Sequence, residues 1–492
     1  MRYKQWNVRG AVGLAGLFHF LHSCALGSLV PFLTLYFRYL GLTAAMTGTI
    51  MASKHFVALL WRPTSSVLAR HYNKRRMVIM LCLIFSAVVP LMLLLFPPTG
   101  ISTESGSCNI SQLNANQVPL ETKGNVKELH HNEFLGNLKV MDAQHQMFFL
   151  VMIIVCLWEV MAAPVEWTAD DGLHEYLDFV DATDRHRAVQ YWKLLGAAGG
   201  VGKAGILVSF LYCLIGTVLH FYTYAAFMVL TASVAALLPL YRHKRERVPG
   251  VGWKAVKLVQ GDPRALLCAI SALLTGMAGS AVSDFILWQM QNHNATELQM
   301  GIILGLTPLC QAVLTPLNGT LTRLLKCHGR MLLLCIIGFS LQCLCYSLLW
   351  TPWAALPAQL LAGLSTGALL WSMEAQCMDI ASPGTERAVQ RVFEAFSLDL
   401  GAGLGSLAGG LVVEKFGVVV LFQGTAAMLA LWGVALAVLQ WRIPRQQKIN
   451  YSRLLVADAS EMSESDSEQE TDWLEKAMEE DKGNNNWRRQ EK

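Results

Sequence analysis

Long apolar segments recur along this chain at intervals typical of a protein that crosses a membrane many times. Twelve such segments can be delimited, and each runs for about 20–28 residues, the length that a helix needs to cross the hydrocarbon core of a bilayer. Charged residues make up 15% of the chain, whereas about 25% is usual in soluble proteins. We therefore expect an all-α membrane protein with 12 transmembrane helices. Their expected positions are 11–37, 45–69, 77–96, 146–168, 188–213, 217–241, 265–290, 299–324, 331–351, 354–377, 388–412 and 418–441.

Basic residues are distributed asymmetrically between these segments. If the N-terminus is cytoplasmic, every inner connection carries Arg or Lys, whereas the short outer loops hold only Arg38 and Lys415. Cytoplasmic loops of membrane proteins are enriched in Lys and Arg, so we expect both termini in the cytoplasm and the protein in the plasma membrane or a membrane of the secretory pathway. Under this topology the sequons at Asn109 and Asn294 lie outside, and they are the candidate glycosylation sites.

The tetrapeptide Arg-Ala-Val-Gln occurs at 187–190 and again 200 residues later at 387–390, each time before a glycine-rich apolar run. Landmarks around the second segment recur around the eighth at an offset of 253. Most of the difference between the offsets of 253 and 200 comes from a long connection at 97–145 that the second half lacks. Six spans return the chain to its starting side, so these matches indicate two parallel six-helix halves. The paired landmarks are Thr43 with Thr296, Gly48 with Gly301, Pro63 with Pro316, and Arg70 with Arg323.

This organisation divides the chain into four parts. We expect an N-terminal six-helix half at 1–241 with its outer loop at 97–145, a cytoplasmic linker at 242–264, a C-terminal half at 265–441 and an acidic tail at 442–492. The outer loop and the tail are polar enough to be disordered. Either one is also a candidate surface for protein partners.

These features together resemble the major facilitator superfamily over about residues 8–441. The stretch PFLTLYFRYLGLT at 31–43 is similar to the end of the first span in the lactose-permease-like branch, and within it the chain resembles the group of domain-containing protein 6 and 6-like proteins. The superfamily signature Gly-x-Leu-Ala-Asp-Arg-x-Gly-Arg-Arg corresponds to SVLARHYNKR at 66–75, where Arg70 replaces the aspartate. The resemblance implies that this aspartate helps to latch the inner gate, so a latch here must use other acids.

Ionisable residues inside the apolar segments are the candidates for a transport cavity. A lone charge at mid-bilayer costs at least about 2.5–3.5 kcal/mol, so such a residue faces protein or a water-filled space. We expect Glu159 to serve transport, and His19 and His22, one turn apart, to be able to relay protons. Structural ion pairs between helices account for the same residues. The cavity candidates are His19, His22, Lys54, Glu159, Lys193, Lys203, Asp284, Glu394 and Asp399.

A second group of charges lies at the inner ends of the segments and suggests a cytoplasmic gate. Asp170 and Glu374 correspond in the two halves, and Arg187 and Arg387 begin the spans that follow them. Charge-assisted hydrogen bonds between such groups could hold this side closed. The gate candidates are Arg70, Glu166, Asp170, Arg187, Arg323, Glu374 and Arg387.

The sequence contains no Walker loop, GxSxG, HExxH or paired CxxC signature, and these are the motifs that would indicate nucleotide, hydrolytic or metal chemistry. We therefore expect no enzyme activity, metal, cofactor or nucleic-acid partner. The sequence predicts a secondary-active transporter of a small polar solute that works by alternating access within the lipid bilayer, with protons as the candidate coupling ion. A transporter-like receptor or scaffold that does not transport is the alternative.

Overall fold

The computed structural model describes residues 8–71, 75–96, 126–180, 182, 185–215, 218–238, 251–315, 328–381 and 385–442. Within these ranges the chain is helical and contains no β-strand. The helices are α1 Val8–Tyr39, α2 Ala44–His71, α3 Arg75–Val88 with the 3-10 helix η1 Val89–Leu95, α4 Val126–Phe179, α5 His186–Ile215, α6 Leu219–Ala235, α7 Val251–Gly261, α8 Pro263–Asn292, α9 Glu297–Leu314, α11 His328–Ser347, the 3-10 helix η5 Pro352–Ala355 with α12 Leu356–Ile380, α13 Glu386–Glu394, the π-helix η6 Ala395–Gly401, α14 Ala402–Phe416 and α15 Val418–Arg442.

Twelve helical segments correspond to the twelve expected spans. In the described part of the chain, ten are long and apolar enough to cross a membrane. The other two are α2, whose 28 residues include Lys54, His55 and Arg62, and α6, which is apolar but has only 17 residues. The expectation of an all-α membrane protein built from two six-helix halves is therefore confirmed.

Local sequence signals explain several of the helix ends. The carboxylate of Asp262 accepts a hydrogen bond from the backbone N–H of Arg264 and so caps α8. Thr296 and Gln299 form a reciprocal capping box at the start of α9, which satisfies backbone N–H groups that the helix itself leaves without partners. Gly417 ends α14 with φ +87°, a conformation that costs glycine little because it has no Cβ.

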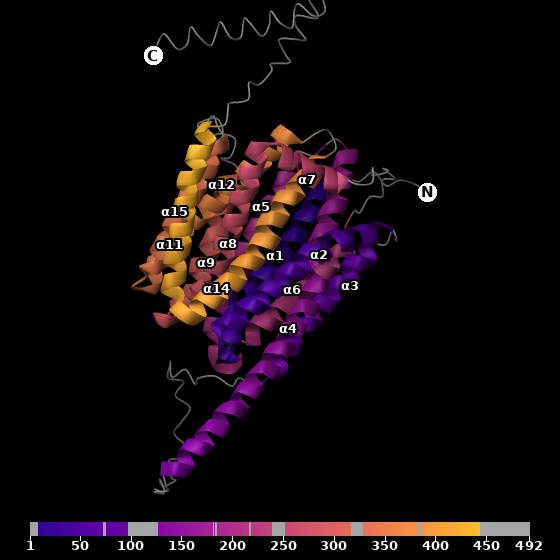
Figure 1. Ribbon diagram of the computed structural model, residues 1–492. Helices are drawn as coiled ribbons and strands as arrows, with labels where there is room; N and C mark the ends of the chain where they lie inside the picture. The colour runs from indigo at the N-terminus through magenta and orange to yellow at the C-terminus, as the bar shows by residue number, and fades with distance from the viewer. Residues whose placement is uncertain are drawn as a thin grey trace, which may run out of the picture. The chain divides into compact units, whose positions relative to one another are not determined.

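The glycine-rich spans of the two halves pack in corresponding ways. The helix α5 lies against α1 of its own half and α9 of the other, whereas α14 lies against α8 of its own half and α2 of the other. In Figure 1 these helices run side by side through the bundle, with α11, α12 and α15 on one side and α3, α4 and α6 on the other. Because α5 and α14 belong to corresponding spans, two related halves should place each of them against one helix of its own half and one helix of the other half, as observed.

Two glycine pairs set how closely the halves approach. A Cβ added at Gly205 of α5 would lie 2.8 Å from the Cα of Gly301 in α9, and one added at Gly410 of α14 would lie 2.8 Å from the Cα of Gly48 in α2. Real Cβ atoms do not come this near to backbone. The glycines therefore let helix backbones of opposite halves meet directly, as small residues do in other membrane bundles.

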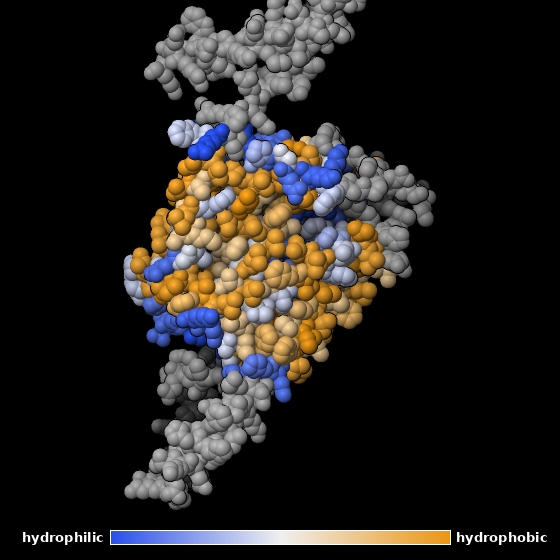
Figure 2. Space-filling model, in the orientation of Figure 1, coloured by the Kyte–Doolittle hydropathy of each residue, from blue (hydrophilic) through white to orange (hydrophobic). Residues whose placement is uncertain are grey.

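The surface has the polarity of a protein embedded in lipid. Large apolar side chains such as Phe210, Leu60 and Leu431 are 84%, 71% and 73% exposed. Figure 2 shows hydrophobic residues across the middle of the visible face and hydrophilic ones gathered towards its upper and lower edges. An apolar surface of this extent belongs against hydrocarbon rather than water.

Two expected connections contain helices that hydropathy did not indicate. The linker expected at 242–264 includes α7, whose Ala255 and Val259 are buried in a cluster that also contains Val389 and Phe393. The loop expected over 97–145 ends earlier than predicted, because α4 already begins at Val126. Residues 97–125, with the candidate sequon at Asn109, and the tail from 443 onward lie outside the described residues.

Candidate functional site

The candidate site is the surface along which the two halves meet. We call α1–α6 the N-terminal half and α8–α15 the C-terminal half. The terminal end of the bundle is the end at which α1 begins and α15 ends, and the far end is the opposite one. Successive spans alternate in direction, so the charges at the start of α5 and α13 lie at the terminal end, whereas the turns from α1 to α2 and from α8 to α9 lie at the far end.

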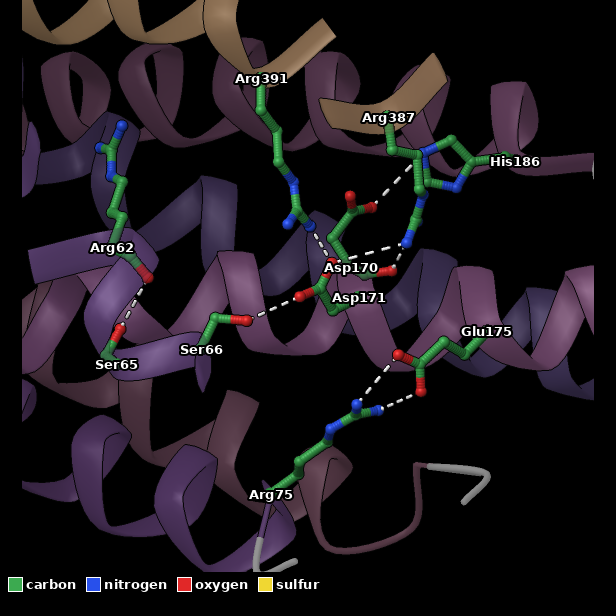
Figure 3. Close-up of polar contacts among 10 residues, drawn as sticks. All are labelled: Arg62, Ser65, Ser66, Arg75, Asp170, Asp171, Glu175, His186, Arg387 and Arg391. Atoms are coloured by element: carbon green, nitrogen blue, oxygen red, sulfur yellow. Dashed lines mark hydrogen bonds and ion pairs between the residues drawn. The ribbon is translucent and has the colours of Figure 1, made fainter. Parts of the chain in front are cut away.

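Arginines and acids join the halves reciprocally at the terminal end. Arg187 of α5 places Nη2 2.8 Å from Oε1 of Glu374 in α12. In the other direction, Arg387 and Arg391 of α13 both reach Oδ1 of Asp171 in α4, Arg387 at 3.5 Å. Figure 3 shows the two arginines extending from α13 towards α4. Each half thus supplies arginine to an acid of the other, and we call these contacts the terminal clasp.

The acid that meets the arginines of α13 is Asp171, not the Asp170 that the sequence pattern indicated. Asp171 is 1% exposed and also accepts a hydrogen bond from Ser66 of α2 at 2.7 Å. The carboxylate of Asp170 instead lies 3.4 Å from Nε2 of His186 in its own half, and the backbone oxygen of Asp170 accepts from Arg387 at 3.5 Å. Successive residues on a helix point about 100° apart, so a shift of one position turns an acid from one neighbouring helix to another.

A further ion pair crosses between the halves deeper in the bundle. Arg62 of α2 donates from Nη1 to Oδ1 of Asp399 at 2.6 Å, and its Nη2 lies 3.9 Å from Oε1 of Glu159 in α4. Glu159 is 5% exposed and Asp399 is 3% exposed. Asp399 lies in the π-helix η6, and π-helical turns are rare and occur frequently at functional sites. Two buried acids of opposite halves therefore share one arginine.

Two other ion pairs stay within the N-terminal half. Lys193 of α5 is bonded to Glu166 of α4, so Glu166 belongs to neither side of the clasp and Lys193 does not bridge the halves. Arg75 of α3 makes two hydrogen bonds, of 2.7 and 3.0 Å, to the carboxylate of Glu175 in α4. Figure 3 shows this second pair on the side of α4 opposite to α13.

Arg38 joins the halves at the far end. Its guanidinium donates to the side-chain oxygens of Gln291 at 2.9 Å and Asn292 at 3.0 Å and lies 5.0 Å from the ring centroid of Trp288. The indole N–H of Trp288 donates in turn to the backbone oxygen of Thr34 at 3.0 Å. Both glycine pairs lie towards this end as well, so in this conformation the halves are joined at both ends.

A histidine contact lies beside one of these glycine pairs. His220 of α6 is buried, with Nδ1 2.9 Å from the backbone oxygen of Ser28 and Nε2 3.4 Å from Oε2 of Glu297 at the start of α9. Its ring stacks on Phe32 at a centroid distance of 4.2 Å. The His220 ring therefore takes part in a contact between the halves.

Four of the remaining cavity candidates are buried or half-buried within the bundle. His19 and His22 are both buried in α1, and Nε2 of His22 has no hydrogen-bond partner within the described residues. Lys54 lies half-buried in α2 with its ammonium 5.5 Å from the ring centroid of Trp158. Asp284 of α8 is 4% exposed and accepts a hydrogen bond from the hydroxyl of Ser406 at 2.6 Å.

Other candidates have local partners or lie outside the described side chains. Lys203 is exposed, with its ammonium 6.0 Å from the ring centroid of Phe227. Glu394 accepts a hydrogen bond from Gln390 one turn earlier on α13. Asn294 is exposed in the turn between α8 and α9. The side chain of Arg70 and the whole of Arg323 are not among those described.

Four residues of this interface were missed by the sequence reasoning: Arg38, Arg62, Asp171 and Arg391. The rule that selected Lys54 also applies to Arg62, since both lie in the expected span 45–69. Arg391 could have been found as the basic residue one turn after Arg387. Nothing in the sequence distinguishes Asp171 from Asp170, because both are acids at the same helix end.

The sequence of this chain is similar to proteins of one family. The MFS_1 like family matches residues 14–424. A zebrafish (Danio rerio) protein, "Major facilitator superfamily domain-containing protein 6-like", is 56% identical over an alignment 529 positions long, gaps included, that covers 98% of this chain and 97% of the relative. The Homo sapiens protein of the same name is 32% identical, with 97% of this chain and 99% of the relative covered.

Two solved structures with a similar arrangement of helices are of transporters. The nucleoside transporter NupG has a TM-score of 0.65 at 14% identity, covering 89% of this chain and 100% of that one. An auto-inhibited peptide transporter of the POT family has a TM-score of 0.59 at 12% identity, covering 89% of this chain and 98% of that one. Identities this low show a shared fold and nothing about the solute.

Proposed function

The chain belongs to the MFS_1 like family of the major facilitator superfamily, and on that premise we propose that it is a secondary-active transporter that moves a small polar solute across a membrane by alternating access. Alternating access requires two halves that rock about a central site, opening one end of the bundle while the other is closed. The contacts between the halves must therefore hold at each end and be able to break.

The observation that carries this proposal is the terminal clasp. Its pairs run in both directions, from Arg187 to Glu374 and from Arg387 and Arg391 to Asp171. The pairs begin at corresponding positions of the two RAVQ copies. A structural interface between halves that never part would gain more from apolar packing than from buried charge.

The two sides of the clasp differ in strength. The side chains of Arg187 and Glu374 are 67% and 38% exposed. An ion pair with this much exposure to water contributes about 0–1 kcal/mol to stability. Asp171 is 1% exposed, and losing its arginines would leave a buried charge at a cost of about 3–5 kcal/mol. Opening of the terminal end therefore requires that solute binding favour the open form by a comparable free energy.

We infer that the terminal end faces the cytoplasm, because its connections carry most of the Arg and Lys residues. We also infer that transport is coupled to protons. Glu159, Asp399 and the unpartnered ring nitrogen of His22 support this, since chains of acids and histidines inside membranes mark proton relays. Glu159 is the acid of the N-terminal half that lies beside Arg62.

Uptake into proteoliposomes tests the proposal. Full-length protein is reconstituted and exposed to a mixture of nucleosides, sugars, amino acids, short peptides and organic acids, with and without an inward proton gradient, and the retained solutes are identified by mass spectrometry. We expect one class of solute to accumulate above protein-free vesicles, more strongly with the gradient, and Glu159→Gln to abolish the gradient's effect. Equal retention with and without protein would overturn transport and favour the receptor or scaffold alternative.

A further inference from the structure

Lys54 is a basic residue in the middle of a membrane-spanning helix. Other basic groups that lie between the halves either meet an acid or donate hydrogen bonds to several oxygens. Arg62 meets Asp399 and Arg187 meets Glu374, whereas Arg38 donates to two side-chain amide oxygens and a backbone carbonyl. Among the residues that the structure describes, no carboxylate lies within salt-bridge distance of Lys54. Its ammonium lies 5.5 Å from the centroid of the Trp158 ring.

That aromatic contact does not compensate the charge fully. A cation over an indole ring gains about 0.5–2 kcal/mol, whereas a charge at mid-bilayer costs at least about 2.5–3.5 kcal/mol. The ring face of Trp158 itself is not open to a ligand, because the side chain is 1% exposed and its N–H donates to Tyr224 and Ser86. An anion bound to Lys54 would supply the remaining compensation of its charge.

Asp284 of α8 is a buried acid on the C-terminal half, of opposite charge to Lys54. It is 4% exposed, and its carboxylate accepts from Ser406, which is hydrogen bonded to Ser280 at 2.7 Å. Within the described ranges, no Lys, Arg or His lies at salt-bridge distance from it. Hydroxyl donors solvate this acid in part, but none of the described basic side chains neutralises its charge by direct contact.

Packing brings these two charges to the same depth. Along α2, Gly48 meets Gly410 and the backbone oxygen of Ser406, and Phe56 meets Gly403. Since Lys54 lies between Gly48 and Phe56, it is at the level of Ser406, and Lys54 is among the charged groups that act electrostatically on Asp284. Among the described residues, a lysine with no acid at salt-bridge distance and an acid with no base at that distance thus lie at a similar depth on opposite halves.

We propose that Lys54 and Asp284 form the two poles of a binding site for a small zwitterion, of which an α-amino acid is the simplest. The carboxylate of the ligand binds the Lys54 ammonium and its ammonium binds the Asp284 carboxylate. Such a ligand compensates both charges at once and draws the halves together, whereas a neutral solute compensates neither. This inference rests on the proposed transport function and names the class of its substrate.

Matched probes on the purified full-length protein test it. L-leucine, L-glutamine and L-phenylalanine are each compared with the des-amino acid and with the decarboxylated amine, and glucose and adenosine serve as neutral solutes. Binding is followed by the ligand-dependent rise in Tm and by scintillation proximity with the labelled compounds. At least one amino acid is expected to bind about 10- to 100-fold more tightly than either of its truncated analogues, the effect of losing one charged hydrogen bond.

Variants then assign the poles. Lys54→Met and Asp284→Asn are each expected to weaken amino-acid binding about 10- to 100-fold, with the first also removing residual affinity for the des-amino acid and the second for the amine. Lys54→Arg and Asp284→Glu keep the charges and should stay within a few-fold of the wild type. Lys415→Met, at an exposed far-end position, controls for loss of a lysine, and size-exclusion profiles show which variants are folded.

The outcomes separate this site from transport itself. Truncated analogues that bind as well as the amino acid, amino-acid binding unchanged in both neutralised variants, or no binding of any zwitterion would each overturn the inference. If the proteoliposomes accumulate a neutral solute equally with wild type and Lys54→Met, the zwitterion site is wrong and the transport function stands. If no solute accumulates but an amino acid binds with the expected dependence on Lys54 and Asp284, the transport function fails and the zwitterion site stands.

Discussion

At the residue scale, one helix position decides which acid holds the halves together. Asp170 and Asp171 are adjacent and chemically identical, yet Asp171 receives the arginines of α13 while Asp170 lies against His186. Sequence correspondence between the halves selected Asp170, because the repeat aligns it with Glu374. Side-chain direction around a helix depends on the rotation of the whole helix, which no local pattern records.

This assignment predicts different effects of two otherwise equal substitutions. Asp171→Asn should destabilise the folded protein by about 2–3 kcal/mol, since it leaves two arginines without their buried acid. Asp170→Asn should cost less than about 1 kcal/mol, because its carboxylate is a third exposed and its partner is a histidine. Thermal unfolding of the purified variants in one detergent measures the difference. Equal losses, or a larger loss for Asp170→Asn, would contradict the assignment.

Arg62 supports a second prediction at this scale. Removing it leaves Glu159 and Asp399 buried without their shared cation. Arg62→Met should therefore lower stability by about 2–3 kcal/mol, somewhat below the 3–5 kcal/mol of a fully buried pair because the arginine side chain is 29% exposed. Combining it with Asp399→Asn should restore part of the loss, and Tm values of the single and double variants show whether it does.

At the element scale, the sequence predicted the membrane-spanning helices but missed a π-helical turn and a short amphipathic helix. The twelve spans follow from hydropathy, since the bilayer sets their length. The π-helix η6 could not be predicted in this way, because one inserted residue in a turn leaves the mean hydropathy unchanged. The helix α7 was missed for a related reason: it is short and amphipathic and packs on α13, whereas hydropathy detects only long apolar runs.

Close glycine contacts between elements give a matched pair of substitutions on α5. A Cβ at Gly205 would meet the backbone of α9 at 2.8–3.2 Å, whereas one at Gly202 would meet nothing within 4 Å. Gly205→Ala should force α5 and α9 apart at the far end and lower Tm, despite the better helix propensity of alanine. Gly202→Ala should be neutral or slightly stabilising. The account of this contact fails if the two variants unfold at the same temperature.

At the scale of the whole molecule, the two halves are held by reciprocal charge at the terminal end and by glycine contacts and Arg38 at the far end. We expect Glu374→Gln and Arg387→Ala each to raise the accessibility of terminal-end positions to a membrane-impermeant thiol reagent several-fold. The first breaks the Arg187–Glu374 side of the clasp, and the second removes one of the two arginines that hold Asp171. Glu175→Gln is the control, since it breaks an ion pair at the same end that lies within one half. Unchanged labelling in both clasp variants, or equal labelling in the control, would contradict the role of the clasp.

The central claim is that the two ends open alternately, and distances between spin labels on the two halves test it most directly. Labels carried by encoded non-native residues at exposed positions 180 and 378 report on the terminal end, and labels at 39 and 350 report on the far end. In the double variant Asp171→Asn with Glu374→Gln, we predict that the distance between 180 and 378 lengthens while that between 39 and 350 stays the same or shortens. Lengthening of both distances together, or of neither, would contradict alternating access.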